Sequence, residues 1–486
     1  EVDIYADIER NLRYSDFVSL LRELIQNSDD SSIDGRNVEV EIHFLKDKLV
    51  LKNNTAFTEN DWKKIKVIGS RNKEGDSSKT GRFGIGFTSV FKICDILKIH
   101  SRNVSKIVDL NLLNTGKTWG QYPPEDTRYH NEDFSEFEFF WRTEESEASR
   151  QIGAETITNE KINTFIDETL NNIQNDIHFL NHINKFNIYK DETLIQRIRI
   201  QKESHSLSDK IYKDTKTICV DGTKTRMVIY HKKLDEYFTK EFDNGTARRK
   251  KGFPLLLSVA LNCSNIQKGR VFCTLPTELK TGFSFDINCD FQPEQSRKQL
   301  IFNKDDAKGR YNTKILNFVP DLLYEIMDDL KEEISVELFY KTLSTSDDSQ
   351  IRSFNLHSLF LNKVKENDCK IINLNKKWYS ISKVKILRQH DHIIRFLHKI
   401  NYLIIPEKHL TFHKFFNEVG VKDFELKDFI QIIEEKIPKK ILLKESIIES
   451  ETELDSIFTY LQNTLNKRLD DRLKMQIGRA SCRERV

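Results

Sequence analysis

The 486-residue sequence predicts an α/β protein made of several domains. Helical spacing of apolar residues before position 30, strict alternation after position 37, and a later mixture of helix-like and strand-like segments together indicate this class. A prior of about 100–200 residues per domain predicts three structural units. No internal repeat is evident, so a repeat array is not expected.

The first predicted element is an amphipathic helix from about residue 16 to residue 30. Its apolar positions follow three- and four-residue spacing, at Phe17, Leu20, Leu21, Leu24 and Ile25. Ser15 precedes them as a candidate N-cap. Because the apolar residues form one stripe, we expect the helix to cover a sheet.

A β-hairpin is predicted next, followed by a loop and a second helix. Val38, Val40, Ile42 and Phe44 alternate with polar residues, and the turn at 46–48 leads into a second strand at 49–51. The stretch 69–80 is polar and carries glycine and serine, which indicates a loop. Glycines and then apolar residues follow over 81–93, where we expect the chain to enter a helix.

The domain boundaries come from changes in pattern along the chain. Residues 1–150 are expected to form the first domain, and the helices and strands of 151–335 a mixed α/β second domain. A short serine-rich stretch marks the start of a partial α+β region over 336–476. The last ten residues, 477–486, resemble the in-frame translation of a common sequencing adapter and are expected to be an artefact.

Composition excludes several classes of function. Hydrophobic residues make up 38% of the chain, and no apolar run approaches the ~20 residues that cross a bilayer, so no membrane segment is expected. Lys plus Arg (77) nearly balances Asp plus Glu (75), which gives no overall field for nucleic acid. The basic run 248–251 is expected to be a solvated loop. Seven cysteines without a C-x-x-C pair indicate reduced thiols and a cytoplasmic location.

The first helix carries a second, polar stripe. Glu23, Asn27 and Asp30 are spaced i, i+4 and i+7, so at about 100° per residue they lie on one side of the helix. One helix can therefore face a sheet and a ligand together. Taken alone, such a stripe is more often a solvated helix face.

The glycine-bearing stretch provides a second chemical signal. Gly81, Gly84 and Gly86 lack side chains where the chain enters a helix, so main-chain N–H groups can approach phosphate oxygens. It is not a P-loop, since no Gly-Lys-Ser/Thr ends it, nor a Rossmann fingerprint, since no strand directly precedes it. Alone, it is more often a tight turn with close packing.

Together, in this order, the two signals resemble a known family. Residues 21–30 (LRELIQNSDD) resemble the N-box of heat-shock-ninety and sacsin-type ATPases, and residues 81–87, with Ser89 and Phe91, resemble their second glycine box. The resemblance implies a Bergerat-type (GHKL) α/β sandwich for the first domain, with ATP and Mg²⁺ as cofactors. The nucleotide-binding residues that the glycine box implies are Gly81, Arg82, Phe83, Gly84, Ile85, Gly86 and Phe87.

The resemblance also implies roles for the polar stripe. Asn27 would hold Mg²⁺ together with the ATP phosphates, and Glu23 would orient or deprotonate the attacking water. A carboxylate suits this role because it can accept a proton at neutral pH. Asp30 would join the water network around the nucleotide, and 69–80 would form a closing lid.

One box departs from the family pattern. The first glycine box normally supplies an aspartate for the adenine amino group, whereas residues 52–58 read KNNTAFT. Asn53 is the candidate replacement, and Asn54 stays open because the loop is shorter by one residue. Ser135 is the candidate for a family threonine hydroxyl on a later strand. The substitution affects ATP affinity and base selectivity rather than the fold.

A third resemblance lies about 200 residues further on. Residues 291–300 (FQPEQSRKQL) resemble the middle-domain segment where heat-shock-ninety chaperones present an arginine to the γ-phosphate, which implies that role for Arg297. The stretch 269–276, with 281–282 and 286–288, resembles a sacsin-type middle domain with a ribosomal-S5-like α/β fold. The alternative for Arg297 is an ordinary surface arginine.

The resemblance implies slow Mg²⁺-dependent ATP hydrolysis that drives lid closure and interdomain switching in a sacsin-like, chaperone-type protein. Client or partner proteins, and a homodimer through regions outside this chain, are further expectations; nucleic acid and membrane are not. Two alternatives stay open. A non-hydrolysing nucleotide-binding scaffold would agree with the missing aspartate. A nucleotide-gated defence or nucleic-acid effector would have its effector domain outside this chain.

Overall fold

The computed structural model describes most of the chain up to residue 387. The described residues are 4–13, 16–32, 34–59, 61–62, 86–115, 119–121, 133–246, 254–294, 298–344, 351, 354–387, 394, 397, 402–405, 407–425, 427–428, 431–432, 459 and 462–463. The chain divides into two compact units. The first holds residues 1–322 with 328–334 and 345–356, and the second holds the rest. Helices and strands mix in both units, which confirms the predicted α/β class.

Helix α2 (Phe17–Asp30) confirms the first predicted element. Asp16 is its N-cap, because its carboxylate accepts a hydrogen bond from the Ser19 N–H at 2.7 Å. The predicted cap, Ser15, lies outside the described residues. The apolar stripe is buried at all five predicted positions, from Phe17 to Ile25. A shorter helix, α1 (Ile4–Leu12), precedes α2.

The predicted hairpin is formed by β1 (Val38–Phe44) and β2 (Lys48–Asn53), which pair antiparallel. The four apolar residues of β1 are at most 1% exposed, so one face of the strand is buried as the alternation predicts. The sheet continues from β2 through four more strands of the first 150 residues. They are β6 (Ser135–Trp141), β3 (Cys94–Ser101), β4 (Val104–Asp109) and β5 (Trp119–Gln121).

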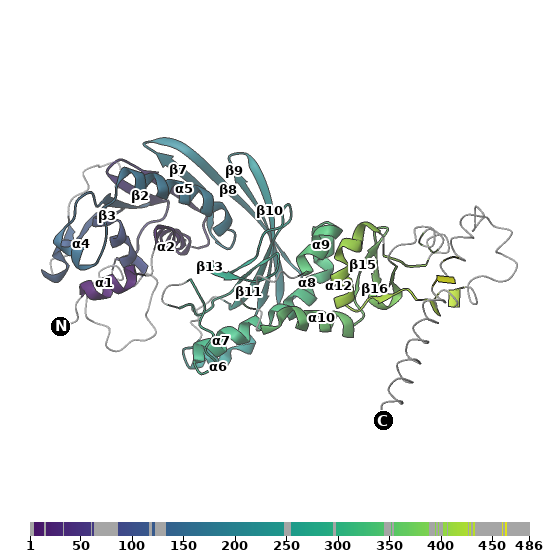
Figure 1. Cartoon of the computed structure of the whole chain (residues 1–486). Helices are drawn as coiled ribbons and strands as arrows, with labels where there is room; N and C mark the ends of the chain where they lie inside the picture. The colour runs from purple at the N-terminus through teal and green to yellow at the C-terminus, as the bar shows by residue number, and fades with distance from the viewer. Residues whose placement is uncertain are drawn as a thin grey trace, which may run out of the picture. The chain divides into compact units, whose positions relative to one another are not determined.

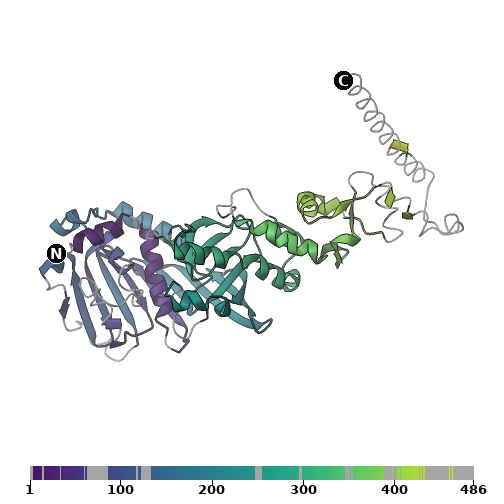
Figure 2. The same cartoon turned by 90° about the horizontal axis from the view of Figure 1, so that it is seen from below.

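A layer of helices covers the buried face of these strands. α2 packs against β1 and lies side by side with α5 (Asn159–Asp176), as Figures 1 and 2 show. The rings of Phe17 and Phe165 stack between the two helices with centroids 3.9 Å apart. The remaining short helices of this layer are α4 (Glu147–Gln151) and the 3-10 helices η1 (Gly86–Lys92) and η2 (Leu110–Thr115).

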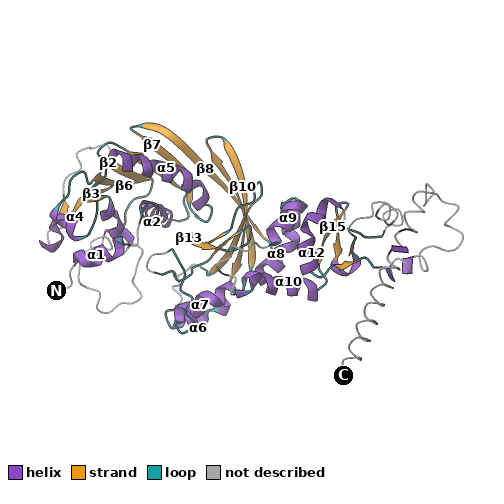
Figure 3. Ribbon diagram, viewed as in Figure 1, coloured by secondary structure: helices purple, strands orange, loops and turns teal. Residues whose placement is uncertain are grey.

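The sheet does not stop at residue 150. β1 also pairs in parallel with β7 (Ile183–Lys190), which joins strands from both sides of that position into one 14-stranded mixed sheet. Figure 3 shows the long strands of its second part. In order from β7 they are β8 (Thr193–Ser206), β9 (Ile211–Val220), β10 (Thr223–Lys233), β11 (Leu256–Asn262), β14 (Asp286–Asn288), β12 (Arg270–Cys273) and β13 (Leu275–Lys280).

Three helices follow or interrupt this part of the sheet. They are α6 (Thr239–Asp243), α7 (Ala307–Leu316) and α8 (Val319–Glu333). Near the end of α8, the carboxylates of Asp329 and Glu333 form ion pairs with the Lys213 ammonium of β9, at 2.8 and 2.6 Å. These ion pairs tie α8 to the sheet.

The second unit is built around Tyr340, which is fully buried. Its hydroxyl accepts a hydrogen bond from the Asn373 N–H at 2.8 Å, and its ring meets Phe416 edge-on at 5.0 Å. The elements of the second unit are α9 (Val336–Leu343), α10 (Leu356–Glu366), β15 (Lys370–Leu374), β16 (Lys377–Ser380), η6 (Ile381–Lys383), β17 (Lys385–Ile386), η7 (Glu407–Phe412), α12 (His413–Glu418) and β18 (Lys422–Asp423).

No described helix of either unit has the length and apolar character needed to span a bilayer.

Candidate functional site

The polar stripe of α2 contains a buried amide with an unpaired end. Asn27 is 8% exposed, while Glu23 and Asp30 on the same side of the helix are half-buried. The Asn27 Nδ2 atom has no hydrogen-bond partner among the described residues. Leaving a buried polar group unsatisfied costs about 1–3 kcal/mol, so such a group indicates a water or a ligand. A half-turn about χ2 lets the amide present either its oxygen or its nitrogen there.

Two predicted nucleotide-binding residues, Asn53 and Ser135, are direct neighbours on the sheet. Asn53, at the end of β2, pairs with Ser135, at the start of β6, and Ser135 pairs with Ser101 at the end of β3. Asn53 also pairs with the buried Val40 of β1, so this row lies on the face that the helices cover. The register therefore brings together residues that are far apart in the sequence.

Asn53 is the centre of a buried hydrogen-bond network. Its Nδ2 donates to the Ser28 hydroxyl of α2 at 3.2 Å, while its Oδ1 accepts from the Thr55 N–H at 3.1 Å and the Thr55 hydroxyl at 2.7 Å. The Ser135 hydroxyl donates to the Thr55 carbonyl oxygen at 2.7 Å. All four residues are at most 7% exposed. The network fixes the chain after β2 against α2 and β6.

The network distinguishes Asn53 from Asn54, the two candidates to accept a hydrogen bond from the adenine amino group. Asn54 is exposed, and its side chain bonds to the main chain of Glu39 and Asn37, so it braces the hairpin outside the buried row. Asn53 lies inside the row, but Thr55 occupies both lone pairs of its amide oxygen. Accepting a bond from an adenine amino group would therefore require the Thr55 hydroxyl to turn away.

The sequence patterns assigned no role to Ser28 and Thr55 of this network, or to Ser101, which contacts it. Ser28 lies within the matched stretch 21–30, and Thr55 lies two residues after Asn53, the spacing at which an Asn side chain often bonds its own backbone. Ser101 has no local signal. Its hydroxyl donates to the Phe134 carbonyl oxygen at 2.8 Å and lies 3.2 Å from the Ser135 hydroxyl. Only the pairing of β3 with β6 places it there.

The glycine box is described only at its end. Residues 81–85 and the predicted lid 69–80 lie outside the described residues, so their predicted roles stay predictions. Gly86 and Phe87 open the 3-10 helix η1, which confirms that a helix follows the glycines. Val90 and Phe91 of η1 are at most 1% exposed and anchor it in the core.

Arg142 fixes the far end of η1. The side chain is 1% exposed, and its Nε lies 2.5 Å from Oδ1 of Asp95. Its remaining nitrogens donate to main-chain carbonyl oxygens at 2.6–3.2 Å, namely those of Phe91, Lys92, Cys94 and Glu155. Carbonyls at a helix end lack helical partners, so this buried guanidinium satisfies the end of the helix that follows the glycine box.

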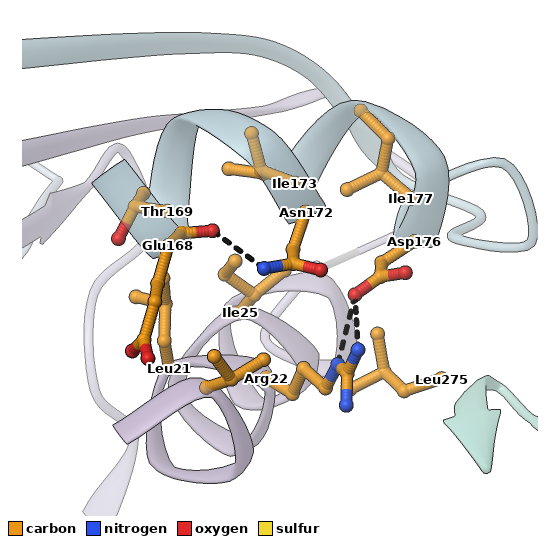
Figure 4. Close-up of a pocket in the computed structure, with 11 residues that line it drawn as sticks. Leu21, Arg22, Ile25, Glu168, Thr169, Asn172, Ile173, Asp176, Ile177 and Leu275 are labelled. Carbon is orange, nitrogen blue, oxygen red and sulfur yellow. Dashed lines mark hydrogen bonds and ion pairs between the residues drawn. The ribbon is translucent and has the colours of Figure 1, made fainter. Parts of the chain in front are cut away.

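A shallow apolar groove lies on another side of α2. It runs between α2 and α5, and Figure 4 shows Arg22 at its end, where Nε and Nη2 donate to Asp176 at 2.8 and 2.6 Å. At 100° per residue, the groove-lining residues of α2 point about 170° away from the stripe of Glu23 and Asn27. The groove is therefore separate from the candidate nucleotide site.

One group of described residues has metal-ligand spacing, on the opposite face of the sheet. Ligand atoms of His100, Glu136 and Glu138 lie within 4.8 Å of one another. Burial raises the pKa of Glu138, but hydrogen bonds from His100 and from Lys48 outweigh it and lower that pKa to about 2. Lys48 lies 2.5 Å from the Glu138 carboxylate, so that carboxylate already has a cationic partner. It is not the predicted Mg²⁺ site.

Arg297 lies outside the described residues, but its neighbour Lys298 is described. The Lys298 ammonium is 3.0 Å from Oε1 of Glu278 and 3.5 Å from Oδ2 of Asp16, the N-cap of α2. Burial alone would raise the pKa of Asp16, yet the bonds from Ser19 and the charge of Lys298 lower it overall. The chain beside Arg297 is thus ion-paired to the first turn of α2.

Comparison with known proteins points to one group. Residues 7–202 match the family model described as Sacsin domain. Human sacsin is 34% identical in an alignment 128 positions long that covers 22% of this chain. The Protein NO VEIN of Arabidopsis thaliana is 24% identical in an alignment 458 positions long that covers 86% of this chain. These matches show that residues 7–202 resemble a Sacsin domain. The matched regions span 3% of sacsin and 16% of NO VEIN.

Proposed function

We propose that this chain binds ATP with Mg²⁺ and hydrolyses it slowly, and that the cycle drives lid closure and interdomain switching in a sacsin-like, chaperone-type protein. The observation that carries the proposal is the buried Asn27 amide, whose Nδ2 has no partner among the described residues. A buried polar group in a stripe with Glu23 and Asp30 fits a ligand that supplies the missing contact.

The donor set suits a magnesium–phosphate group. Mg²⁺ prefers oxygen ligands and is held by a few protein oxygens together with phosphates, a role open to the amide oxygen of Asn27. Bound there, the ion would neutralise phosphate charge. Glu23, four residues earlier on the same side of α2, would accept a proton from water or orient it. Main-chain N–H groups of residues 81–87 would hold the phosphates.

A non-hydrolysing nucleotide-binding scaffold is the second candidate, and one observation favours it. The side-chain oxygen of Asn53 already accepts two hydrogen bonds from Thr55, so the adenine end of the proposed site is less able to accept a hydrogen bond from a ligand than the phosphate end. Weak nucleotide binding would follow from this arrangement, in agreement with a scaffold that does not hydrolyse ATP. Hydrolysis by the wild-type chain distinguishes the two candidates.

We expect the wild-type chain to bind ATP far more tightly with Mg²⁺ than with EDTA, because Asn27 would contact the phosphates through the ion. Asn27→Ala should weaken Mg-ATP binding by at least about tenfold, or ~1.4 kcal/mol. Isothermal titration calorimetry measures both. Asn171→Ala is the matched control, since Asn171 is an exposed residue of α5. Equal affinity in Asn27→Ala and wild type, or no binding by folded wild type, would refute the site.

A further inference from the structure

The outer face of the sheet, which is the side that the helices do not cover, is polar where β2, β6 and β3 lie next to one another (Figure 3). The odd-numbered residues of β6, from 135 to 141, are at most 6% exposed, whereas Glu136 and Glu138 between them are half-buried. His100 of β3 is in register with Glu136. Because side chains alternate along a strand, one imidazole and two carboxylates share this face.

The ligand atoms of these three residues are spaced as in a tetrahedral metal site. All lie within 4.8 Å of one another, and Nε2 of His100 is 3.6 Å from Oε2 of Glu138. Zinc holds nitrogen and oxygen ligands at about 2.0–2.2 Å, which places two tetrahedral ligands roughly 3.3–3.6 Å apart. The side chains of His100 and Glu138 are 15% and 13% exposed, so an ion can reach them from solvent.

Two neighbouring side chains orient these ligands through the atoms that face away from the cluster. The buried Ser105 hydroxyl lies 2.9 Å from Nδ1 of His100, on the other side of the ring from Nε2. The Lys48 ammonium lies 2.5 Å from Oε1 of Glu138, which leaves Oε2 directed at His100. Metal-binding histidines and carboxylates usually bond their second atom to such a partner, which fixes the direction of the first.

The charge of Glu136 is less well compensated than that of Glu138. Within the described part of the chain, its carboxylate forms neither a hydrogen bond nor an ion pair. Burial raises the pKa of Glu136, and the neighbouring Glu138 raises it further, against the weaker effects of His100, Lys52 and Lys48. A divalent cation between the two carboxylates would balance the charge of both.

We propose that His100, Glu136 and Glu138 bind a zinc ion that joins β3 to β6 on the outer face. An imidazole suits zinc, whereas Mg²⁺ and Ca²⁺ prefer ligand sets made only of oxygen. Three protein ligands leave the fourth tetrahedral position for water. Ser101 and Ser135 follow and precede two of these ligands in the sequence and point to the opposite face, so zinc binding is separate from the proposed nucleotide site and does not depend on it.

The test is a calorimetric titration of the full chain, stripped with EDTA and dialysed, with zinc chloride and without nucleotide. Glu136→Gln keeps the size of the side chain and should weaken zinc binding by at least about tenfold. His43→Gln is the matched control, because His43 lies 3.4 Å from Glu41 on the same face but has only that one carboxylate beside it. It should change the affinity by less than about twofold. Equal zinc affinity in Glu136→Gln and wild type, or no zinc binding by folded wild type, would overturn the inference.

Co²⁺ in place of zinc provides a spectroscopic test of the same ligands. Tetrahedral Co²⁺ absorbs visible light far more strongly than six-coordinate Co²⁺, so the wild-type chain should give an intense visible band. The band should be lost in His100→Gln and kept in His43→Gln. Far-UV circular dichroism shows that each variant is folded, which we expect because these side chains are only half-buried. A weak, six-coordinate spectrum in wild type, or an intense band that His100→Gln leaves unchanged, would contradict the site.

Discussion

Arg142→Ala should lower the free energy of unfolding of the first unit by about 3–5 kcal/mol, the range found when one partner of a buried ion pair is removed. The substitution leaves the Asp95 carboxylate, with a side chain only 14% exposed, without its guanidinium. It also removes the hydrogen bonds that the guanidinium donates to four main-chain carbonyl oxygens around the end of η1. Urea unfolding followed by tryptophan fluorescence measures the change, because Trp141 is the adjacent residue and lies in the core.

Arg150→Ala is the matched control for this prediction. Arg150 pairs with Glu145 at 3.3 Å, but the two side chains are 66% and 58% exposed. Exposed pairs contribute about 0–1 kcal/mol, so the control should shift the unfolding midpoint little. Arg142→Lys should recover less than half of the loss, since an ammonium cannot reach the same set of oxygens. Equal shifts for Arg142→Ala and Arg150→Ala would show that the buried cluster does not support the fold.

Glu23→Gln should lower ATP turnover by about a hundredfold or more while changing Mg-ATP affinity by less than about threefold. Gln keeps the shape of the side chain but removes the proton acceptor, and general-base catalysis typically contributes about 10²–10⁴ in rate. Steady-state phosphate release gives the turnover, and calorimetry gives the affinity. Glu23 is half-buried and lies on the same side of α2 as Asn27, so the turnover of Glu23→Gln and the Mg-ATP affinity of Asn27→Ala test the same candidate site.

Three outcomes of this experiment separate the mechanisms. Undiminished hydrolysis in Glu23→Gln would remove Glu23 from the reaction. A parallel loss of binding and turnover would make it a structural residue of α2. Binding without turnover in the wild-type chain would favour the non-hydrolysing scaffold. Glu160→Gln is the control, since Glu160 is an exposed residue at the start of α5.

The sequence by itself determined the elements whose signals are local. The spacing from Phe17 to Ile25 predicted α2 to within a residue, and the alternation from Val38 to Phe44 predicted β1 and its buried face. The same periodicity placed Glu23 and Asn27 on one side of the helix. Such features follow from the helical and strand repeat alone, because neighbours three, four or two positions apart fix which side chains share a face.

Only the tertiary structure decided what lies opposite those faces. It paired β1 with β7 and so extended one sheet past residue 150, and it aligned Asn53 with Ser135 and Ser101. It also placed the Ser28 hydroxyl of α2 where it accepts a hydrogen bond from Asn53. Strand partners and buried hydrogen bonds join residues far apart in the chain, and they depend on register and close packing, which the order of residues along one segment does not specify.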